Sequence, residues 1–287
     1  MKPTGLKTRI FLDSGDPAET KKIIELLGFL DGQTTNPTLV SRNPHARERF
    51  DRGEKFSKAE IYDFYRQVLS EISALIPGGS VSAEVYADKS TGADEMFTQG
   101  QTMYAWIPNA HIKYPTIAAG LEAAERSVKA NMRVNMTLCF SQEQAAAVHV
   151  ATKGAARGNV YVSPFIGRLD DIGQNGMDLI ANLVKMYGAS VRHVDVLAAS
   201  VRNLPQLMQS LALGADIITA PYKVLSEWGE AGLPLPGQYF SYDKGSLEDI
   251  PYEELDLSQP WRSFDITHPL TDKGVDNFAA DWNQLIS

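Results

Sequence analysis

Short apolar runs alternate with longer helical patterns along most of this chain of 287 residues. The predicted strands are 9–13, 32–36, 80–85, 110–114, 133–138, 159–164, 192–200 and 215–220, and the clearest helical segments between them are 18–30, 59–76, 117–130 and 178–188. Within the first helical segment, Ile23, Ile24 and Leu27 fall on one face at helical spacing. Such repeated strand–helix units predict a parallel sheet with right-handed crossovers, and eight of them close most economically into a (β/α)₈ TIM barrel.

The rival architecture is an open, doubly wound sheet. That fold favours a glycine-rich phosphate-binding turn after its first strand. The first turn here reads DSGDPAET and has no such fingerprint, and the chain has no Walker lysine loop. The sequence therefore favours the barrel.

The amino-acid composition of the chain changes after the last predicted strand. We expect a barrel core over about 9–228, an irregular extension over 229–271 that is rich in proline, aromatic and acidic residues, and a terminal helix over 272–286. The extension is expected to wrap the barrel or partly cover its mouth. No linker divides the chain, so a single domain over 1–287 is predicted.

Composition narrows the functional classes. Cys139 is the only cysteine, so no intrachain disulfide forms, and this suits a reducing cytoplasm. No apolar stretch has the length of a bilayer span, and the N-terminus meets acidic residues before any long apolar run, unlike a signal peptide. The formal net charge of −8 argues against a general nucleic-acid binder, although a few arginines can still make a local site for an anionic substrate.

Polar residues mark the carboxyl ends of seven consecutive predicted strands. They are Asp13, Thr35, Asn36, Glu84, Lys113, Asn135, Thr137, Ser163, Arg168, Ser200 and Arg202. Any one of them is ordinarily a turn former, a helix cap, a satisfied core hydroxyl or a cation that reaches the rim. In a TIM barrel, however, all of these ends meet on one face, where the chemistry of such folds is located. The convergence predicts a site there.

The residue types suggest a covalent mechanism. A desolvated lysine such as Lys113 can act as a nucleophilic amine and form a Schiff base with a carbonyl substrate. Glu84 and Asp13 can move the protons that this chemistry requires, and Arg168 and Arg202 can bind a phosphate dianion. The five histidines are scattered and Cys139 has no partner, so neither a metal site nor a cofactor is expected.

These residues lie in stretches that resemble the transaldolase family of class I Schiff-base enzymes. The stretches are FLDSGD (11–16), TTNPTL (34–39), SAEV (82–85), IKYPTIAAGLEA (112–123), NMTLCFSQEQA (135–145), YVSPFIGRLDDIG (161–173) and LAASVRN (197–203). They follow the family's order over roughly residues 9–228, and the terminal helix looks similar as well.

The resemblance implies roles for individual residues. Lys113 would form the Schiff base, Asp13 would be the acid/base at the sugar hydroxyl, and Glu84 would act through a water held by Thr137. Thr35, Asn36, Asn135, Ser163 and Phe165 would lie at the substrate, and Arg168, Ser200 and Arg202 would bind its phosphate. The implied reaction moves a dihydroxyacetone unit from sedoheptulose 7-phosphate to glyceraldehyde 3-phosphate, giving erythrose 4-phosphate and fructose 6-phosphate in the pentose phosphate pathway.

Two alternatives remain open on sequence alone. The related fructose 6-phosphate aldolases are shorter lyases with a tyrosine in place of Phe165 and a lysine in place of Arg202. A non-catalytic barrel acting as a scaffold is the other. The sequence also leaves open a homo-oligomer, and the charged segment 41–58 has no clear counterpart in the family.

Overall fold

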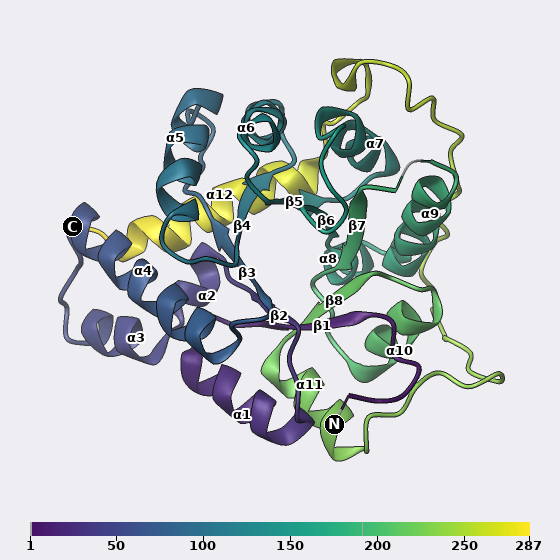
Figure 1. The fold of residues 1–287 in the computed structure, drawn as a ribbon, viewed down its shortest axis with the longest axis horizontal. Helices are drawn as coiled ribbons and strands as arrows, with labels where there is room; N and C mark the ends of the chain where they lie inside the picture. The colour runs from purple at the N-terminus through teal and green to yellow at the C-terminus, as the bar shows by residue number, and fades with distance from the viewer. Residues whose placement is uncertain (1, 191) are drawn as a thin grey trace.

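Eight parallel strands form a closed barrel in sequence order, β1 to β8 (Figure 1), in the computed structural model, which describes residues 2–190 and 192–287. The strands are β1 Arg9–Asp13, β2 Gly32–Thr34, β3 Ser80–Glu84, β4 Ala110–Pro115, β5 Val134–Cys139, β6 Val160–Pro164, β7 Val194–Ala198 and β8 Ile217–Ala220. Every neighbouring pair is parallel, and β8 pairs with β1 to close the barrel. The predicted TIM barrel is confirmed.

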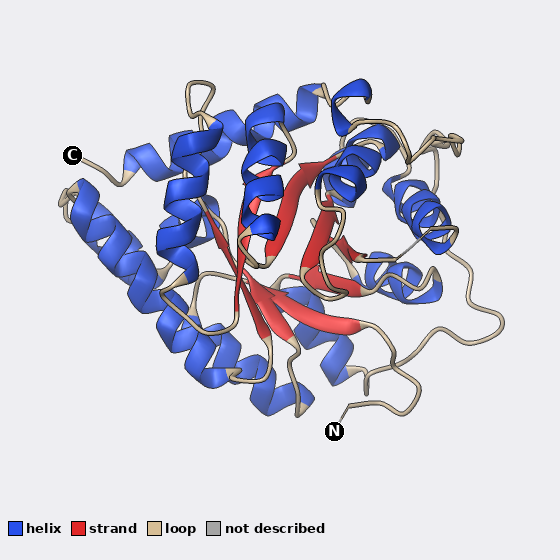
Figure 2. Cartoon of the chain, turned by 45° about the horizontal axis from the view of Figure 1, so that its top comes forward, coloured by secondary structure: helices blue, strands red, loops and turns tan. Residues whose placement is uncertain are grey.

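Helices surround the barrel on the outside (Figure 2). They are α1 Pro17–Leu27, α2 Pro37–Ser41, α3 Pro44–Asp51, α4 Lys58–Leu75, α5 Ala93–Tyr104, α6 Ala118–Lys129, α7 Gln142–Ala151, α8 Ile166–Asp170, α9 Gly176–Gly188, α10 Leu204–Ala212, α11 Tyr222–Glu230 and α12 Pro269–Gln284, with a short 3₁₀ turn at Trp261–Ser263. No helix among these described residues is both long enough and apolar enough to cross a bilayer.

Strand and helix ends follow local chemistry that the periodicity does not resolve. The predicted strand over 32–36 ends at Thr34 because Asn36 caps α2, its Oδ1 accepting a hydrogen bond from the Leu39 N–H at 2.9 Å. Helix α1 ends at Gly28, whose φ of 76° is in the left-handed region that glycine adopts without a steric penalty.

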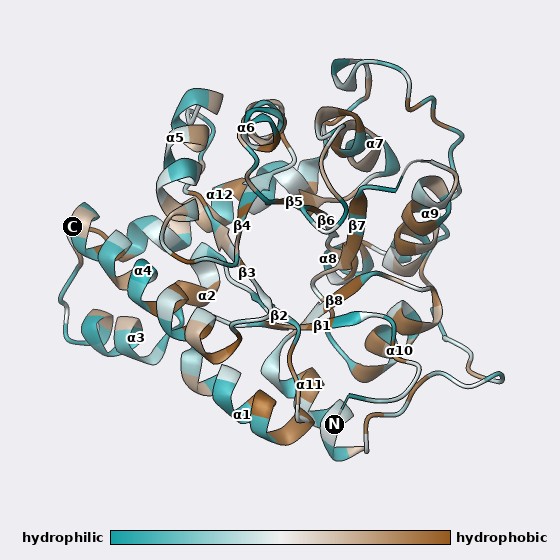
Figure 3. Cartoon of the chain, in the orientation of Figure 1, coloured by the Kyte–Doolittle hydropathy of each residue, from teal (hydrophilic) through white to brown (hydrophobic). Residues whose placement is uncertain are grey.

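The core lies between the barrel wall and the inner faces of the helices. Ile10, Ile112, Val162 and Ile218 come from four different strands and are all fully buried. Figure 3 shows this pattern as hydrophobic colour on β7 and β8 and hydrophilic colour over much of α3. Burial of apolar area contributes about 25 cal/mol per Å² and drives the closure of the barrel.

The extension between α11 and α12 follows the outer surface of the barrel and is attached by buried amide side chains. Gln142 on α7 pairs with the backbone of Glu253 as both donor and acceptor. Asn182 on α9 donates to the Ile250 carbonyl at 3.0 Å. These amides satisfy backbone groups of a segment whose regular structure, among the described residues, is limited to the 3₁₀ turn at Trp261–Ser263 and a single bridge between Gln174 and Glu248.

Helix α12 crosses the barrel near β5 (Figure 1). It begins at Pro269, three residues before the predicted start, because His268 caps it and proline suits the first helical turn. Thr271 donates to the Leu138 carbonyl on β5 at 2.9 Å. The charged segment 41–58 holds the other end of this helix, since the Phe56 N–H donates to the Leu285 carbonyl at 2.8 Å.

Candidate active site

A cavity of about 460 Å³ opens at the carboxyl ends of the strands. It is lined by Asp13, Thr34, Asn36, Thr38, Leu39, Arg42, Lys113, Ser163, Phe165, Arg168, Ala199, Ser200, Arg202, Thr219 and Phe278. Eight of the residues singled out from the sequence are in this set: Asp13, Asn36, Lys113, Ser163, Phe165, Arg168, Ser200 and Arg202. The strand ends therefore meet as the barrel topology requires.

Lys113 lies inside the barrel at the base of this cavity. Its side chain is 3% exposed, its Nζ lies 2.8 Å from Glu84 Oε2, and it donates to the Thr35 carbonyl at 3.1 Å. Burial raises the pKa of Glu84, while the nearby Lys113 cation acts in the opposite direction. Glu84 Oε2 has no well-aligned hydrogen bond in the described chain, so its 2.8 Å contact with Nζ is an ion pair.

Asp13 stands on β1 at the same end of the barrel, supported by two threonines. Thr34 donates to Asp13 Oδ1 at 2.5 Å, and Thr219 on β8 lies 2.6 Å from the Thr34 hydroxyl. Because the single Thr34 proton goes to Asp13, the Thr219 hydroxyl must donate to Thr34. Burial raises the pKa of Asp13, and Lys113 and Arg168 oppose this rise. A carboxyl whose pKa is raised in this way accepts a proton more readily than an exposed aspartate does.

The β5 residues Asn135 and Thr137 are fully buried and are not part of the cavity lining. Asn135 donates to the Ser82 hydroxyl at 3.0 Å and accepts from the Ser163 hydroxyl at 2.6 Å. Thr137 is fully buried and its Oγ1 has no partner in the described chain. The next residue, Leu138, has a φ of 58°, where the register between β5 and β6 shifts. Such bulges often occur beside active sites and redirect side chains there.

Thr35 reaches the site through its carbonyl and not through its hydroxyl. The Thr35 hydroxyl lies 2.6 Å from the Tyr65 hydroxyl and donates to the Ser82 carbonyl at 2.8 Å. Tyr65 on α4 also accepts from the Glu84 N–H at 2.9 Å. Tyr65 thus links the two residues that contact the Lys113 amine, Thr35 through its carbonyl and Glu84 through its carboxylate.

Arg168 projects from α8 between two aromatic rings. Its guanidinium lies 5.2 Å from the Phe165 ring centre and 5.4 Å from that of Phe278 on α12. Burial lowers the pKa of Arg168. No carboxylate among the described residues lies within ion-pair distance of it, so its charge is available to an anion in the cavity.

Ser200 and Arg202 follow β7 on the same side. Ser200 has a φ of 59°, an uncommon conformation for a residue with a side chain. Arg202 forms a two-pronged ion pair with Asp171, at 2.7 and 3.2 Å. The Arg202 side chain lies directly against Gly167, where a Cβ would come within 2.6 Å of Arg202 Nε, so a glycine is needed at this position.

Several residues around the site were not predicted from the sequence. Thr34 could have been found, because alternation along the predicted strand 32–36 places it on the same face as Asn36. Tyr65 and Phe278 reach the site from helices α4 and α12, Arg42 from the C-cap of α2 and Thr219 from β8, and no local pattern marks them.

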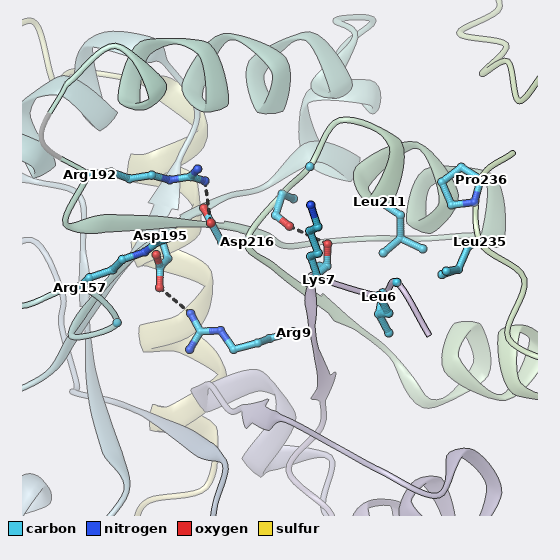
Figure 4. Close-up of a pocket in the computed structure, with 15 residues that line it drawn as sticks. Leu6, Lys7, Arg9, Arg157, Arg192, Asp195, Leu211, Asp216, Leu235 and Pro236 are labelled. Carbon is cyan, nitrogen blue, oxygen red and sulfur yellow. Dashed lines mark hydrogen bonds and ion pairs between the residues drawn. The ribbon is translucent and has the colours of Figure 1, made fainter. Parts of the chain in front are cut away.

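A second cavity, of about 650 Å³, lies at the opposite end of the barrel and is the larger of the two (Figure 4). Arg9 pairs there with Asp195 at 2.5 Å, and Arg192 pairs with Asp216 at 2.6 Å. Residues at the amino-terminal face of such barrels usually serve stability. The chemistry therefore favours the smaller cavity at the carboxyl ends. Across the described ranges, no cluster of three or more histidine, cysteine, aspartate or glutamate side chains could hold a metal ion.

The fold and this geometry define a class, a closed (β/α)₈ barrel with a buried lysine–glutamate pair at the carboxyl ends of its strands. A family model described as transaldolase/fructose-6-phosphate aldolase matches residues 10–287. The chain belongs to this family, which confirms the resemblance seen in the sequence.

Curated relatives agree over nearly their full lengths. A probable transaldolase of Dehalococcoides mccartyi is 36% identical over 277 residues, covering 96% of this chain and 99% of the relative. A probable transaldolase of Caulobacter vibrioides is 34% identical over 276 residues, covering 96% of each chain. These names indicate a transaldolase-type enzyme. A solved 3-hexulose-6-phosphate synthase from Salmonella typhimurium aligns with a TM-score of 0.49 at 13% identity, covering 78% of this chain and 97% of that one.

Proposed function

We propose that the protein is a transaldolase that carries a dihydroxyacetone unit on Lys113. The donor is sedoheptulose 7-phosphate and the acceptor is glyceraldehyde 3-phosphate, so the products are erythrose 4-phosphate and fructose 6-phosphate. The observation that carries this proposal is the 2.8 Å contact between the buried Lys113 Nζ and Glu84 in a cavity rich in arginine.

The first stage makes the covalent bond. A proton passes from Nζ to Glu84, and the free amine adds to the C2 carbonyl of the ketose. The resulting carbinolamine then loses water to give the imine. Thr137 supports this assignment, because its buried, unpartnered hydroxyl lacks the hydrogen bond that a water molecule would supply there. The raised pKa of Glu84 suits a group that takes a proton and returns it.

The second stage breaks the C3–C4 bond. Asp13 takes the C4 hydroxyl proton, the aldose leaves with a new carbonyl, and the electron pair remains on the three-carbon enamine. The enamine then attacks the acceptor aldehyde, whose oxygen takes the proton from Asp13. Hydrolysis of the new imine releases the product and restores the amine. The Asn135 and Ser163 pair supports binding of the three-carbon unit, since both side chains lie near the end of the barrel that holds Lys113.

The balance between transfer and simple cleavage rests on Phe165. Cleavage alone requires protonation of the enamine, and the phenyl ring of Phe165 offers no hydroxyl for that step. The Phe165 ring lines the cavity and lies 5.9 Å from the Phe140 ring, centre to centre. This favours transfer over the aldolase reaction that the family description also names.

A coupled assay tests the proposal. Glyceraldehyde 3-phosphate formed from fructose 6-phosphate should appear rapidly only when erythrose 4-phosphate is added as acceptor. A comparable rate without the acceptor would support the aldolase, and no rate in either condition would support a non-catalytic barrel. Phosphorylated sugars are thus the proposed partners, and the single buried cysteine accords with a cytoplasmic location.

A further inference from the structure

The proposed phosphate end of the cavity contains less free positive charge than its arginines suggest. A sugar phosphate carries close to two negative charges at neutral pH. Arg168 has no carboxylate partner among the described residues, but both outer nitrogens of Arg202 contact Asp171. Because Asp171 partly neutralises Arg202, one more free cation would be needed to balance the dianion.

Arg42 is such a cation. It lines the same cavity, is exposed, and forms no ion pair with any carboxylate in the described ranges. Arg42 stands at the C-cap of α2, three residues after the last residue of the stretch TTNPTL (34–39), and belongs to the charged segment 41–58. No catalytic step of the proposed function uses it.

The short helix that carries Arg42 is fixed on both sides. The Asn43 amide donates to the Gly15 carbonyl at 2.7 Å, which joins this helix to the loop after β1. Thr38 hydrogen-bonds to Asp281 on α12. These bonds fix the backbone that carries Arg42 at the edge of the cavity, while the exposed Arg42 side chain still gives up rotamer freedom when it binds an anion.

Topology places Arg42 opposite the other two arginines. It follows β2, whereas Arg168 and Arg202 follow β6 and β7, and β2 and β6 are four strands apart in a closed barrel of eight. We infer that Arg42 supplies the second free cation for the substrate's phosphate, contacting it from the wall opposite Arg168. This inference builds on the proposed function, and it makes Arg42 a residue that selects phosphorylated over unphosphorylated sugars.

Direct binding of inorganic phosphate tests the inference without turnover. Arg42→Met should weaken phosphate binding about 5- to 20-fold in calorimetry, the effect of losing one charge-assisted contact at an exposed site. Arg47→Met is the matched control, because Arg47 is also exposed, lies five residues further along on α3, and does not line the cavity. Equal affinities for the two variants would overturn the inference.

A second variant tests the charge balance. Asp171→Asn should release Arg202 and tighten phosphate binding, and in that background the loss from Arg42→Met should shrink. If Arg42→Met weakens phosphate binding as much in the Asp171→Asn background as in wild type, Arg42 does not compensate for the Asp171–Arg202 pair.

Kinetics separate this inference from the proposed function. Arg42→Met should raise the KM for glyceraldehyde 3-phosphate by a factor similar to its effect on phosphate binding. Its kcat and its KM for unphosphorylated glyceraldehyde should match those of Arg47→Met. If both variants catalyse transfer and bind phosphate equally well, the inference about Arg42 is wrong and the proposed function still holds. If phosphate binding depends on Arg42 but the wild-type protein has no transfer activity, the proposed function is wrong and the inference about Arg42 still holds.

Discussion

Glu84 and Lys113 are register partners on neighbouring strands β3 and β4, and their charged groups meet inside the barrel at 2.8 Å. Each side chain is less than 5% exposed. Desolvating two charges costs several kcal/mol per ion unless the pair is well matched, so such a pair is poor evidence of a purely stabilising role. The geometry accords with the proposed function, in which Lys113 and Glu84 exchange a proton.

Asp13→Asn is expected to separate bond formation from bond cleavage. The amide cannot accept the C4 hydroxyl proton, so kcat should fall by about 10²- to 10⁴-fold. Schiff-base formation should persist, since Lys113 and Glu84 are unchanged. Steady-state turnover of fructose 6-phosphate with erythrose 4-phosphate, compared with reductive trapping of the same variant, measures both effects. Unchanged turnover would remove Asp13 from the mechanism.

The same substitution should change the pH dependence of stability. Burial raises the pKa of Asp13 above its ordinary value of 3.8, so the folded protein binds this proton more tightly than the unfolded chain does. The Asp13 contribution to stability therefore falls as the pH rises from 3.8 through the raised folded value. Asp13→Asn should unfold at a higher denaturant concentration than wild type at pH 7, and this gap should close toward pH 4. A gap that widens on acidification would contradict the stated direction.

Tyr65→Phe should disturb the Glu84–Lys113 pair from a distance. The variant leaves the buried Glu84 N–H without its acceptor and the Thr35 hydroxyl without a partner on α4, which should cost about 1–3 kcal/mol of stability. We expect a lower kcat with little change in KM. Tyr62→Phe is the control, because Tyr62 contacts the same two tryptophans, Trp106 and Trp282. Its hydroxyl bonds to Gln99 on α5 and not to the barrel. Equal effects of the two substitutions would argue against a positioning role for Tyr65.

Gly274→Ala tests whether α12 is part of the site. A Cβ at this position would lie 2.5 Å from Leu138 Cδ2 and 3.0 Å from Arg168 Nη1. Since Leu138 is fully buried, the helix must shift, at a cost of about 1–3 kcal/mol. The KM for phosphorylated substrates should rise as Arg168 moves. Gly237→Ala, where an added Cβ meets nothing within 4 Å, should leave both stability and KM near wild type. A silent Gly274→Ala would show that α12 is loosely packed there.

The barrel could be predicted from the sequence because its signal is local and repeated. Eight apolar runs separated by helical patterns have few economical closures, and the strand ends then collect their polar residues on one face. Lys113, Asp13 and Arg168 could be singled out for this reason. The periodicity does not fix strand ends, as at Asn36, where a helix cap shortens the predicted strand.

What could not be predicted depends on contacts between distant segments. Phe278 lies more than 100 residues from Arg168 in the sequence, yet its ring lies against that guanidinium. The path of the extension is set by Gln142 and Asn182. These are polar residues of the kind usually found on a helix surface, but here their amides are buried beneath the extension. The left-handed conformation of Leu138 has no sequence signal either, because leucine rarely adopts it without tertiary constraint.

Reductive trapping tests the central claim most directly. Borohydride added with fructose 6-phosphate should fix a three-carbon adduct or the whole sugar to one peptide, and mass mapping should locate it at Lys113. Lys113→Met, still folded by circular dichroism, should give no adduct, whereas Lys89→Met, which removes an exposed amine that pairs with Asp276 on α12, should be labelled like wild type. An adduct on another lysine, or none in folded wild-type protein, would contradict the account.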